Sequence, residues 1–190
     1  MKIGCVVMAA GSANRFGSNK LLVSVGGRSL IRRALESVPV SELEKVVVVA
    51  GCREVAEVAE SFGFLVVENR SPELGQSRSI RLGLLALPEC DGALFMVADQ
   101  PMLRQETVAA QLSFFRENPE HIVALGHGGR RGNPCVFPAG YFPELLALEG
   151  DIGGSAVIKR HPEALLIFEA AERELEDVDT PRALEALDKK

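Results

Sequence analysis

Residues 3–20 read IGCVVMAAGSANRFGSNK. The segment begins with a short apolar run, Ile3–Ala9, which is typical of a buried strand in a parallel sheet. A loop rich in small and basic residues follows directly. Because open parallel sheets bind ligands beyond the carboxyl ends of their strands, this loop lies where a ligand is expected. The stretch therefore predicts an α/β fold with a ligand-binding loop after the first strand.

Apolar runs and helical patterns alternate along the rest of the chain. Further strands are predicted at 46–50, 65–67, 93–98, 122–125, 135–137 and 165–168. Helices are predicted at 29–38, 54–62, 77–87, 106–116 and 181–187, and the segment 126–134 is predicted to be a loop. Strands that alternate with helices form βαβ units. We therefore predict a Rossmann-like three-layer αβα sandwich with a mostly parallel, mixed sheet of about seven strands.

The composition argues against several classes of function. The formal net charge is −5 and the sequence pI is about 5.3, whereas a nucleic-acid-binding surface usually shows a basic patch. The four cysteines include no C-x-x-C pair, so zinc and thioredoxin-like sites lack their spacing. No signal-peptide pattern opens the chain, and no apolar run reaches the roughly 18 residues of a membrane span. We expect a cytoplasmic protein with neither nucleic acid nor membrane as a partner.

The loop after the first strand carries residue types that bind a polyphosphate. Gly11 and Gly17 allow the backbone to approach phosphate oxygens closely, because they have no Cβ. Arg15 and Lys20 add two positive charges, and an arginine can bind a phosphate through two parallel hydrogen bonds. The spacing matches neither the P-loop nor the G-x-G-x-x-G fingerprint. The alternative is a flexible loop with solvated basic residues, and the loop alone does not decide between the two.

Two aspartates are candidates for a Mg²⁺ site. Asp99 follows the apolar run 93–98, and Asp179 lies in the segment DVDTP before the last predicted helix. Carboxylate and phosphate oxygens together are typical Mg²⁺ ligands, and the ion would neutralise phosphate charge that Arg15 and Lys20 leave uncompensated. The alternatives are a turn aspartate at position 99 and a helix-capping aspartate at position 179.

Residues 9–20 closely resemble the A-A-G-x-[SG]-x-R-[FM]-G-x-x-K loop of the nucleotidyltransferases that complete the molybdenum cofactor. The match covers Ala9, Ala10, Gly11, Arg15, Phe16, Gly17 and Lys20, whereas Ala13 departs from it. Segments 75–84, 97–107, 131–138, 150–154 and 177–181 resemble further motifs of this family in the same order. The resemblance implies a single nucleotidyltransferase domain, 1–190. Its nucleotide-binding half is expected at approximately 1–105 and its acceptor-binding half at 106–190.

The resemblance also implies roles for individual residues. It assigns nucleotide binding to Ala9, Ala10, Gly11, Arg15, Gly17, Lys20, Gly75, Ser79, Arg81 and Asp99. Among these, it makes Arg15, Lys20 and Asp99 catalytic. It assigns metal binding to Asp99 and Asp179, and acceptor binding to Arg131, Asn133 and Asp151. On the acceptor side, Asn133 replaces the usual histidine and Ser155 replaces the usual arginine.

Ala10 bears on the choice of nucleotide. Family members that transfer a guanylyl group carry L-A-G-G at this point, and cytidylyl-transferring members carry L-A-A-G. A methyl group at Ala10 would crowd a purine and leave room for a pyrimidine. The resemblance therefore implies a Mg²⁺-dependent enzyme of molybdenum cofactor biosynthesis that transfers CMP from CTP to molybdopterin and releases pyrophosphate. A molybdoenzyme is the expected recipient of the product.

Three alternatives to this function stay open. The donor is GTP in the first. In the second, the acceptor is another phosphate, such as a sugar phosphate or a phospholactate. In the third, the protein is a carrier of the molybdenum cofactor that has lost its transferase activity. A site that had lost its activity would be expected to lose its metal-binding carboxylates first, because a cluster of unpaired acidic groups has an electrostatic cost. The presence of Asp99 and Asp179 beside Arg15 and Lys20 therefore argues against the carrier.

Overall fold

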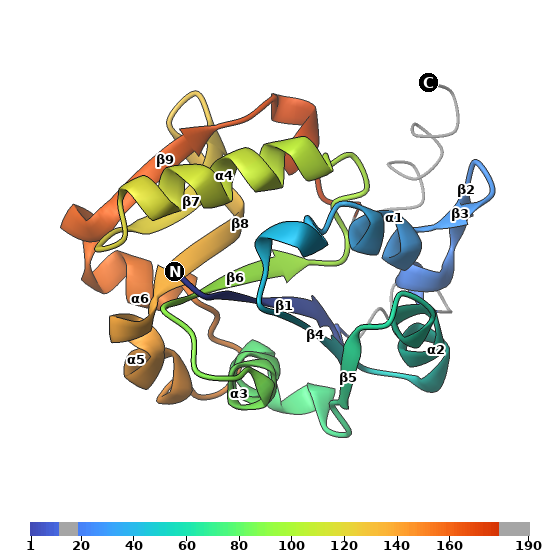
Figure 1. Cartoon of the computed structure of the whole chain (residues 1–190). Coiled ribbons are helices and arrows are strands. Elements are labelled where there is room, and N and C mark those ends of the chain that lie inside the picture. Colours follow the sequence, from blue (N-terminus) through green and yellow to red (C-terminus); the bar gives the residue numbers. More distant parts are fainter. Residues whose placement is uncertain (12–18, 179–190) are drawn as a thin grey trace.

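The computed structural model describes residues 1–11 and 19–178, and their strands and helices form three layers (Figure 1). Three of the predicted site residues, Arg15, Gly17 and Asp179, lie outside the described residues. The helix predicted at 181–187 also lies outside them.

A seven-stranded sheet forms the middle layer. Its strands are β1 (Ile3–Ala9), β4 (Lys45–Ala50), β5 (Leu65–Glu68), β6 (Gly92–Val97), β7 (Ile122–His127), β8 (Arg130–Pro138) and β9 (Leu165–Glu169). Their order across the sheet is β5-β4-β1-β6-β8-β7-β9. β8 is antiparallel to both of its neighbours, and the other neighbouring strands are parallel. The predicted α/β fold with a mostly parallel, mixed sheet is thus confirmed. Strands β2 (Ser24–Val25) and β3 (Arg28–Ser29) form a separate small hairpin.

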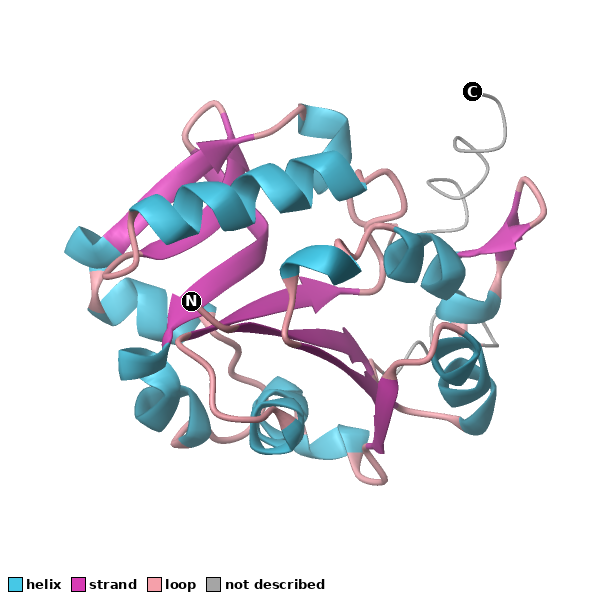
Figure 2. Ribbon diagram, viewed as in Figure 1, coloured by secondary structure: helices cyan, strands magenta, loops and turns pink. Residues whose placement is uncertain are grey.

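Helices cover both faces of this sheet (Figure 2). On one face lie α1 (Leu30–Glu36), α2 (Arg53–Ser61) and α4 (Gln105–Glu117); on the other lie α3 (Gln76–Ala86), α5 (Phe142–Leu146) and α6 (Ser155–Arg160). Successive side chains of β1 enter different cores, because a strand points its side chains alternately to its two faces. Cys5 and Val7 pack beneath α1, α2 and α4, and Val6 packs beneath α3. No helix in the described part of the chain is long and apolar enough to cross a membrane.

The segment 126–134, expected to be a loop, is instead part of a β-hairpin. β7 ends at His127, which pairs with Arg130 of β8, so two residues connect the strands. These residues, Gly128 and Gly129, both have positive φ angles (55° and 79°), as a type I′ turn requires. The loop prediction was wrong because its glycines and arginines, which are typical of loops, form the turn and the exposed end of the hairpin.

The contact between α3 and the sheet leaves no room for a side chain at Gly83. A Cβ atom there would lie 2.3 Å from Val6 Cγ1 and 3.2 Å from Val49 Cγ2. Gly83 lies in the segment 75–84 that resembles a family motif, and in the structure this glycine allows the helix to approach β1 and β4 closely.

We expect Gly83→Val to lower the free energy of unfolding by about 1–3 kcal/mol, the usual cost of overpacking a core. Urea denaturation followed by circular dichroism measures this change. Gly140→Ala is the matched control, because a Cβ atom at Gly140 would have no heavy atom within 4 Å. Equal stabilities of the two variants would contradict the close packing of α3.

Candidate active site

A cavity of about 500 Å³ opens at the carboxyl ends of β1 and β6. In the sheet, β4 is the neighbour of β1 on one side and β6 is its neighbour on the other. The strand order therefore reverses between β1 and β6. Such a switch point is the usual ligand site of an open α/β sheet. The cavity brings together nine residues predicted from the sequence: Ala10, Gly11, Lys20, Gly75, Ser79, Asp99, Arg131, Asn133 and Asp151.

Two other predicted nucleotide-binding residues do not line this cavity. Ala9 is 1% exposed and packs into the core on the opposite face of the sheet, beneath α1 and α2. Arg81 is exposed on α3, and its Nη2 atom donates a hydrogen bond of 3.3 Å to the carbonyl of Leu148. The structure thus gives both residues packing or backbone contacts away from the cavity, and their binding roles stay predictions.

An ion pair joins the two sides of the switch point. The Nζ atom of Lys20 lies 2.8 Å from Oδ2 of Asp99 and also donates to the carbonyl of Val178 at 3.2 Å. The backbone N–H of Val178 donates to the carbonyl of Asp99 at 2.9 Å. Only 17% of the Lys20 side chain and 24% of the Asp99 side chain are exposed, which limits screening of this pair by solvent. The end of the loop after β1, the end of β6 and the segment near residue 178 therefore meet at one point.

Asn19 fixes the backbone that presents Lys20. Its side-chain oxygen accepts a hydrogen bond of 3.1 Å from the N–H of Leu21, and its amide group donates to Cys52 Sγ at 3.2 Å. The first contact caps the short 3₁₀ helix Lys20–Leu22. Lys20 is therefore held at the start of a capped turn, facing Asp99.

Asp177, which was not predicted from the sequence as a site residue, also lines the cavity. It lies in the DVDTP segment, from which only Asp179 was predicted to bind metal. The signal was present, because this segment carries two aspartates two residues apart. The sequence alone does not show that Asp177 faces the cavity.

The amino terminus of α3 meets the segment 150–154. The Ser77 hydroxyl donates a hydrogen bond of 2.7 Å to the carbonyl of Gly150, and the N–H of Gln76 donates to Oδ1 of Asp151 at 3.3 Å. A carboxylate at a helix amino terminus is stabilised by the helix dipole and by the free N–H groups of the first turn. Asp151, predicted to bind the acceptor, thus also caps the helix that carries the predicted nucleotide-binding residue Ser79.

A buried asparagine that the sequence argument missed orients Ser79. Asn69 is 2% exposed; its amide donates to Ser79 Oγ at 3.1 Å, and its Oδ1 accepts from Nε of Arg78 at 3.0 Å. Asn69 follows β5 directly, at the same edge of the sheet as the cavity. A polar residue just beyond a strand was the available signal.

The cavity combines polar side chains of β8 with an apolar floor. Arg131 and Asn133 of β8 lie on the rim. The floor consists of Met8, Ile80, Phe95, Val97, Cys135, Phe137 and Leu145. The rings of Phe95 and Phe137 pack edge to face, with centroids 5.8 Å apart. The apolar side chains can pack against the flat face of a ring, and the polar side chains can bind the groups at its edge.

Cys135 is a neutral thiol at this site. Burial raises the pKa of the Cys135 thiol to about 11, although Arg131 opposes this rise. Its sulfur donates a hydrogen bond of 3.4 Å to the carbonyl of Gly132. Because the thiolate is the nucleophilic form, Cys135 contributes to the wall of the cavity and does not act as a nucleophile near neutral pH.

The cavity offers oxygen donors suited to a hard divalent cation. The described residues contain no group of three or more His, Cys, Asp or Glu side chains that could hold a metal ion by themselves. Asp99 and Asp177 line the same cavity, however, and Mg²⁺ is commonly bound by one or two carboxylates plus substrate phosphates and water. The residues present therefore fit an ion that arrives together with a polyphosphate.

Comparison with known proteins identifies a domain family. The sequence pattern of the MobA-like NTP transferase domain matches residues 5–165. This match extends from β1 to the start of β9 and includes almost all of the residues around the cavity.

Two relatives match over almost their whole length. A nicotine blue oxidoreductase of Paenarthrobacter nicotinovorans is 29% identical over 187 residues, covering 92% of this chain and 91% of the relative. The purine catabolism protein PucB of Bacillus subtilis (strain 168) is 28% identical over 194 residues, covering 93% and 91%. A probable molybdenum cofactor guanylyltransferase of Aquifex aeolicus is 33% identical over 116 residues, covering 60% of this chain and 54% of the relative.

Rv0371c of Mycobacterium tuberculosis H37Rv has the same fold. Its crystal structure superposes with a TM-score of 0.78 at 24% sequence identity, covering 100% of this chain and 99% of the other. A second structure of Rv0371c, in complex with manganese, gives a TM-score of 0.74.

Proposed function

Since the chain belongs to the MobA-like NTP transferase family, we propose that it transfers CMP from CTP to molybdopterin and releases pyrophosphate. The observation that carries this proposal is the Lys20–Asp99 ion pair, which faces the cavity beside Gly11 at the switch point of the sheet. One cationic group, one carboxylate and a glycine backbone are what a metal-bound triphosphate needs at a single point.

The proposed reaction is an in-line displacement at the α-phosphorus of CTP. The terminal phosphate of molybdopterin attacks, the bond to the β-phosphate oxygen breaks, and pyrophosphate leaves. A bound Mg²⁺ ion supplies charge neutralisation at the phosphate oxygens. Lys20 binds a phosphate oxygen as a point charge, and Asp99 holds the metal side of the triphosphate. Arg15 and Asp179, predicted from the sequence, complete this set. No protein nucleophile is needed, which agrees with the neutral state of Cys135.

The acceptor is proposed to lie over β8. Arg131 binds its phosphate, Asn133 contributes a hydrogen bond on the rim, and the apolar floor around Phe95 and Phe137 receives its ring system. The flat face of a ring system can pack on these apolar side chains while its polar edge meets the rim, which supports a ring-containing acceptor such as molybdopterin. A molybdoenzyme is proposed as the recipient of the product.

The base specificity is proposed to depend on Ala10, which lines the cavity and is 5% exposed. We expect Ala10→Gly to raise the ratio of kcat/KM for GTP to kcat/KM for CTP by about tenfold or more, the usual effect of one methyl group in a pocket. Pyrophosphate release measures both constants. Ala98→Gly is the matched control, because Ala98 lines the same cavity beside Asp99. An unchanged ratio in Ala10→Gly would remove the steric basis for a CTP donor.

A GTP donor is the second candidate, and the relative named as a probable molybdenum cofactor guanylyltransferase favours it. The decisive experiment incubates the protein with Mg²⁺, molybdopterin and each of the four ribonucleoside triphosphates in turn, and measures pyrophosphate. Release with CTP alone supports the proposal, and release with GTP alone supports the second candidate. Binding of molybdopterin without release indicates a carrier.

A parallel assay addresses the relative named as an oxidoreductase. It follows the absorbance of NADH and NADPH in the presence of nicotine blue, without any triphosphate. Oxidation of either nucleotide, together with no pyrophosphate release in the first assay, would overturn the proposed transferase activity.

A further inference from the structure

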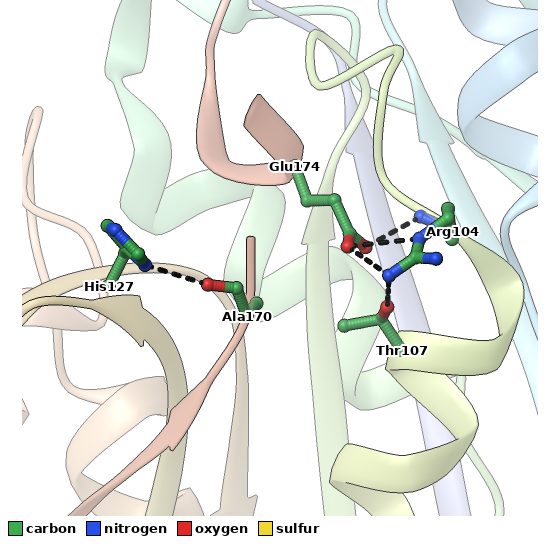
Figure 3. A network of polar contacts seen from close by, with 5 residues as sticks. All are labelled: Arg104, Thr107, His127, Ala170 and Glu174. Carbon is green, nitrogen blue, oxygen red and sulfur yellow. Dashed lines mark hydrogen bonds and ion pairs between the residues drawn. The ribbon is translucent and has the colours of Figure 1, made fainter. Parts of the chain in front are cut away.

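A buried carboxylate links the segment before Asp177 to the loop after β6 (Figure 3). Glu174 has a fully buried side chain and lies on the 3₁₀ helix Glu172–Leu175. Its Oε1 accepts hydrogen bonds from Arg104 Nε at 3.0 Å and Arg104 Nη2 at 2.7 Å, and its Oε2 accepts from the Arg104 N–H at 3.2 Å. Arg104 is the residue just before α4, and its Nη2 also reaches the Thr107 hydroxyl at 3.5 Å.

Glu174 is ionised in this setting. Burial raises the pKa of the Glu174 carboxyl, but the hydrogen bonds from Arg104 and Thr107 outweigh burial and leave the pKa below its ordinary value. A buried carboxylate is costly unless it is paired, so the geometry of these contacts is strongly constrained. The Arg104 side chain is 56% exposed, so the pair lies at the edge of the interior.

Further contacts continue from this pair to the cavity. Gln100, which is 2% exposed, donates from Nε2 to the carbonyl of Leu175 at 3.3 Å. The N–H of Val178 then donates to the carbonyl of Asp99 at 2.9 Å. Hydrogen bonds therefore join the loop 99–104 to the segment 174–178 at three positions: 104 with 174, 100 with 175, and 99 with 178. Asp177 lies between two of these bonded positions and faces the cavity.

We propose that Glu174 is a positioning residue for the divalent cation that accompanies the triphosphate. Through Arg104 and the backbone contacts, Glu174 fixes the position of Asp177 relative to Asp99, and so determines how tightly the two carboxylates hold the ion. This inference rests on the proposed function, because it concerns the metal side of the same cavity. It assigns a role to Asp177 and Glu174 in addition to the predicted metal ligands Asp99 and Asp179.

Glu174→Gln tests the inference, because glutamine keeps the size of the side chain and removes its charge. The probe is Mn²⁺ alone, with free Mn²⁺ measured by electron paramagnetic resonance, so the readout does not depend on turnover. We expect the Kd for Mn²⁺ to rise about tenfold, as when a group that orients a metal ligand is removed. In the assay, the half-saturating Mg²⁺ concentration should rise similarly, whereas kcat at saturating Mg²⁺ should stay within about twofold.

Two further variants keep the test interpretable. Arg104→Lys changes the half-exposed partner of Glu174 and keeps its positive charge. This variant buries no new group, so it should fold. It should weaken Mn²⁺ binding less than Glu174→Gln does. Glu42→Gln is the matched control: it removes an ion pair of 2.8 Å with Arg116 at the other end of α4, and Glu42 does not line the cavity. It should leave Mn²⁺ binding unchanged.

The outcomes separate this inference from the proposed function. Unchanged Mn²⁺ affinity in both Glu174→Gln and Arg104→Lys would overturn the positioning role, and so would an equal loss of affinity in Glu42→Gln. If the wild-type protein binds no Mn²⁺ even after CTP is added, both the positioning role and the proposed metal role in catalysis fail. Weaker Mn²⁺ binding in Glu174→Gln, together with no pyrophosphate release by the wild type, would support the positioning role and refute the proposed reaction.

Discussion

Asp99→Asn is expected to reduce kcat/KM for nucleotidyl transfer by at least about 10²–10³-fold, the loss seen when one charge-stabilising group is removed from an active site. The asparagine keeps the shape of the side chain and still accepts a hydrogen bond from Lys20, but it has no charge with which to hold a cation. The backbone contact between position 99 and Val178 does not involve the side chain. The fold should therefore persist, as measured by circular dichroism and thermal unfolding.

Asp91→Asn is the matched control for this variant. Asp91 precedes β6, at the opposite end of the same strand, and its Oδ2 accepts a hydrogen bond of 2.7 Å from the N–H of Lys2. It does not line the cavity at the carboxyl end of the strand. Normal pyrophosphate release is expected from Asp91→Asn. Wild-type turnover by Asp99→Asn would instead remove Asp99 from the metal site.

Gly75→Ala is expected to damage both stability and activity. Gly75 has a φ angle of +90°, and a Cβ atom there would lie 2.4 Å from the carbonyl carbon and oxygen of Gly150 and 2.5 Å from Cα of Asp151. Backbone atoms cannot rotate away as the end of a flexible side chain can. The segment 150–154 must therefore move away from α3. We expect a loss of about 1–3 kcal/mol in the free energy of unfolding.

The same displacement should lower kcat/KM by about 10²-fold, because a shift of about 1 Å in a substrate-positioning group costs that much. Urea denaturation and pyrophosphate release measure the two effects. Gly63→Ala isolates the cost of a positive φ angle: Gly63 has φ +75°, and a Cβ atom there would have no heavy atom within 4 Å. It should be destabilised with no loss of activity. Equal activities of the two alanine variants would show that the segment 150–154 does not contribute to the site.

The repeating βα units of this chain could be predicted from its sequence because most strands are buried on both faces. A strand of this kind is a continuous apolar run, and Ile3–Ala9 was predicted with the bounds that the structure shows. α5 and α6 were missed, because helices of five and six residues are too short to show a helical period. The antiparallel direction of β8 depends on a turn of two glycines, which also occur in loops.

The candidate site could be predicted where the chain carries residues with distinctive chemistry at the ends of strands. Asp99 follows β6 closely, Lys20 ends the glycine-rich loop after β1, and the two meet as an ion pair. Glu174 could not be found in this way, because it lies among other acidic residues in the segment EREL and reads as a solvated charge. Its burial depends on Arg104, 70 residues earlier in the chain, and no local pattern encodes such a contact.

The bond between Val178 and Asp99 has a consequence for protein synthesis. On the ribosome, β6 is translated long before residue 178, and β9, the last of the strands among the described residues, ends at Glu169. A nascent chain can therefore contain every strand of the sheet while the Val178 carbonyl that Lys20 contacts has not yet been made. Translation that stops before residue 172 would yield a chain that has every described strand but lacks Glu174, Asp177 and Val178, so the candidate site can be completed only after the strands have been synthesised.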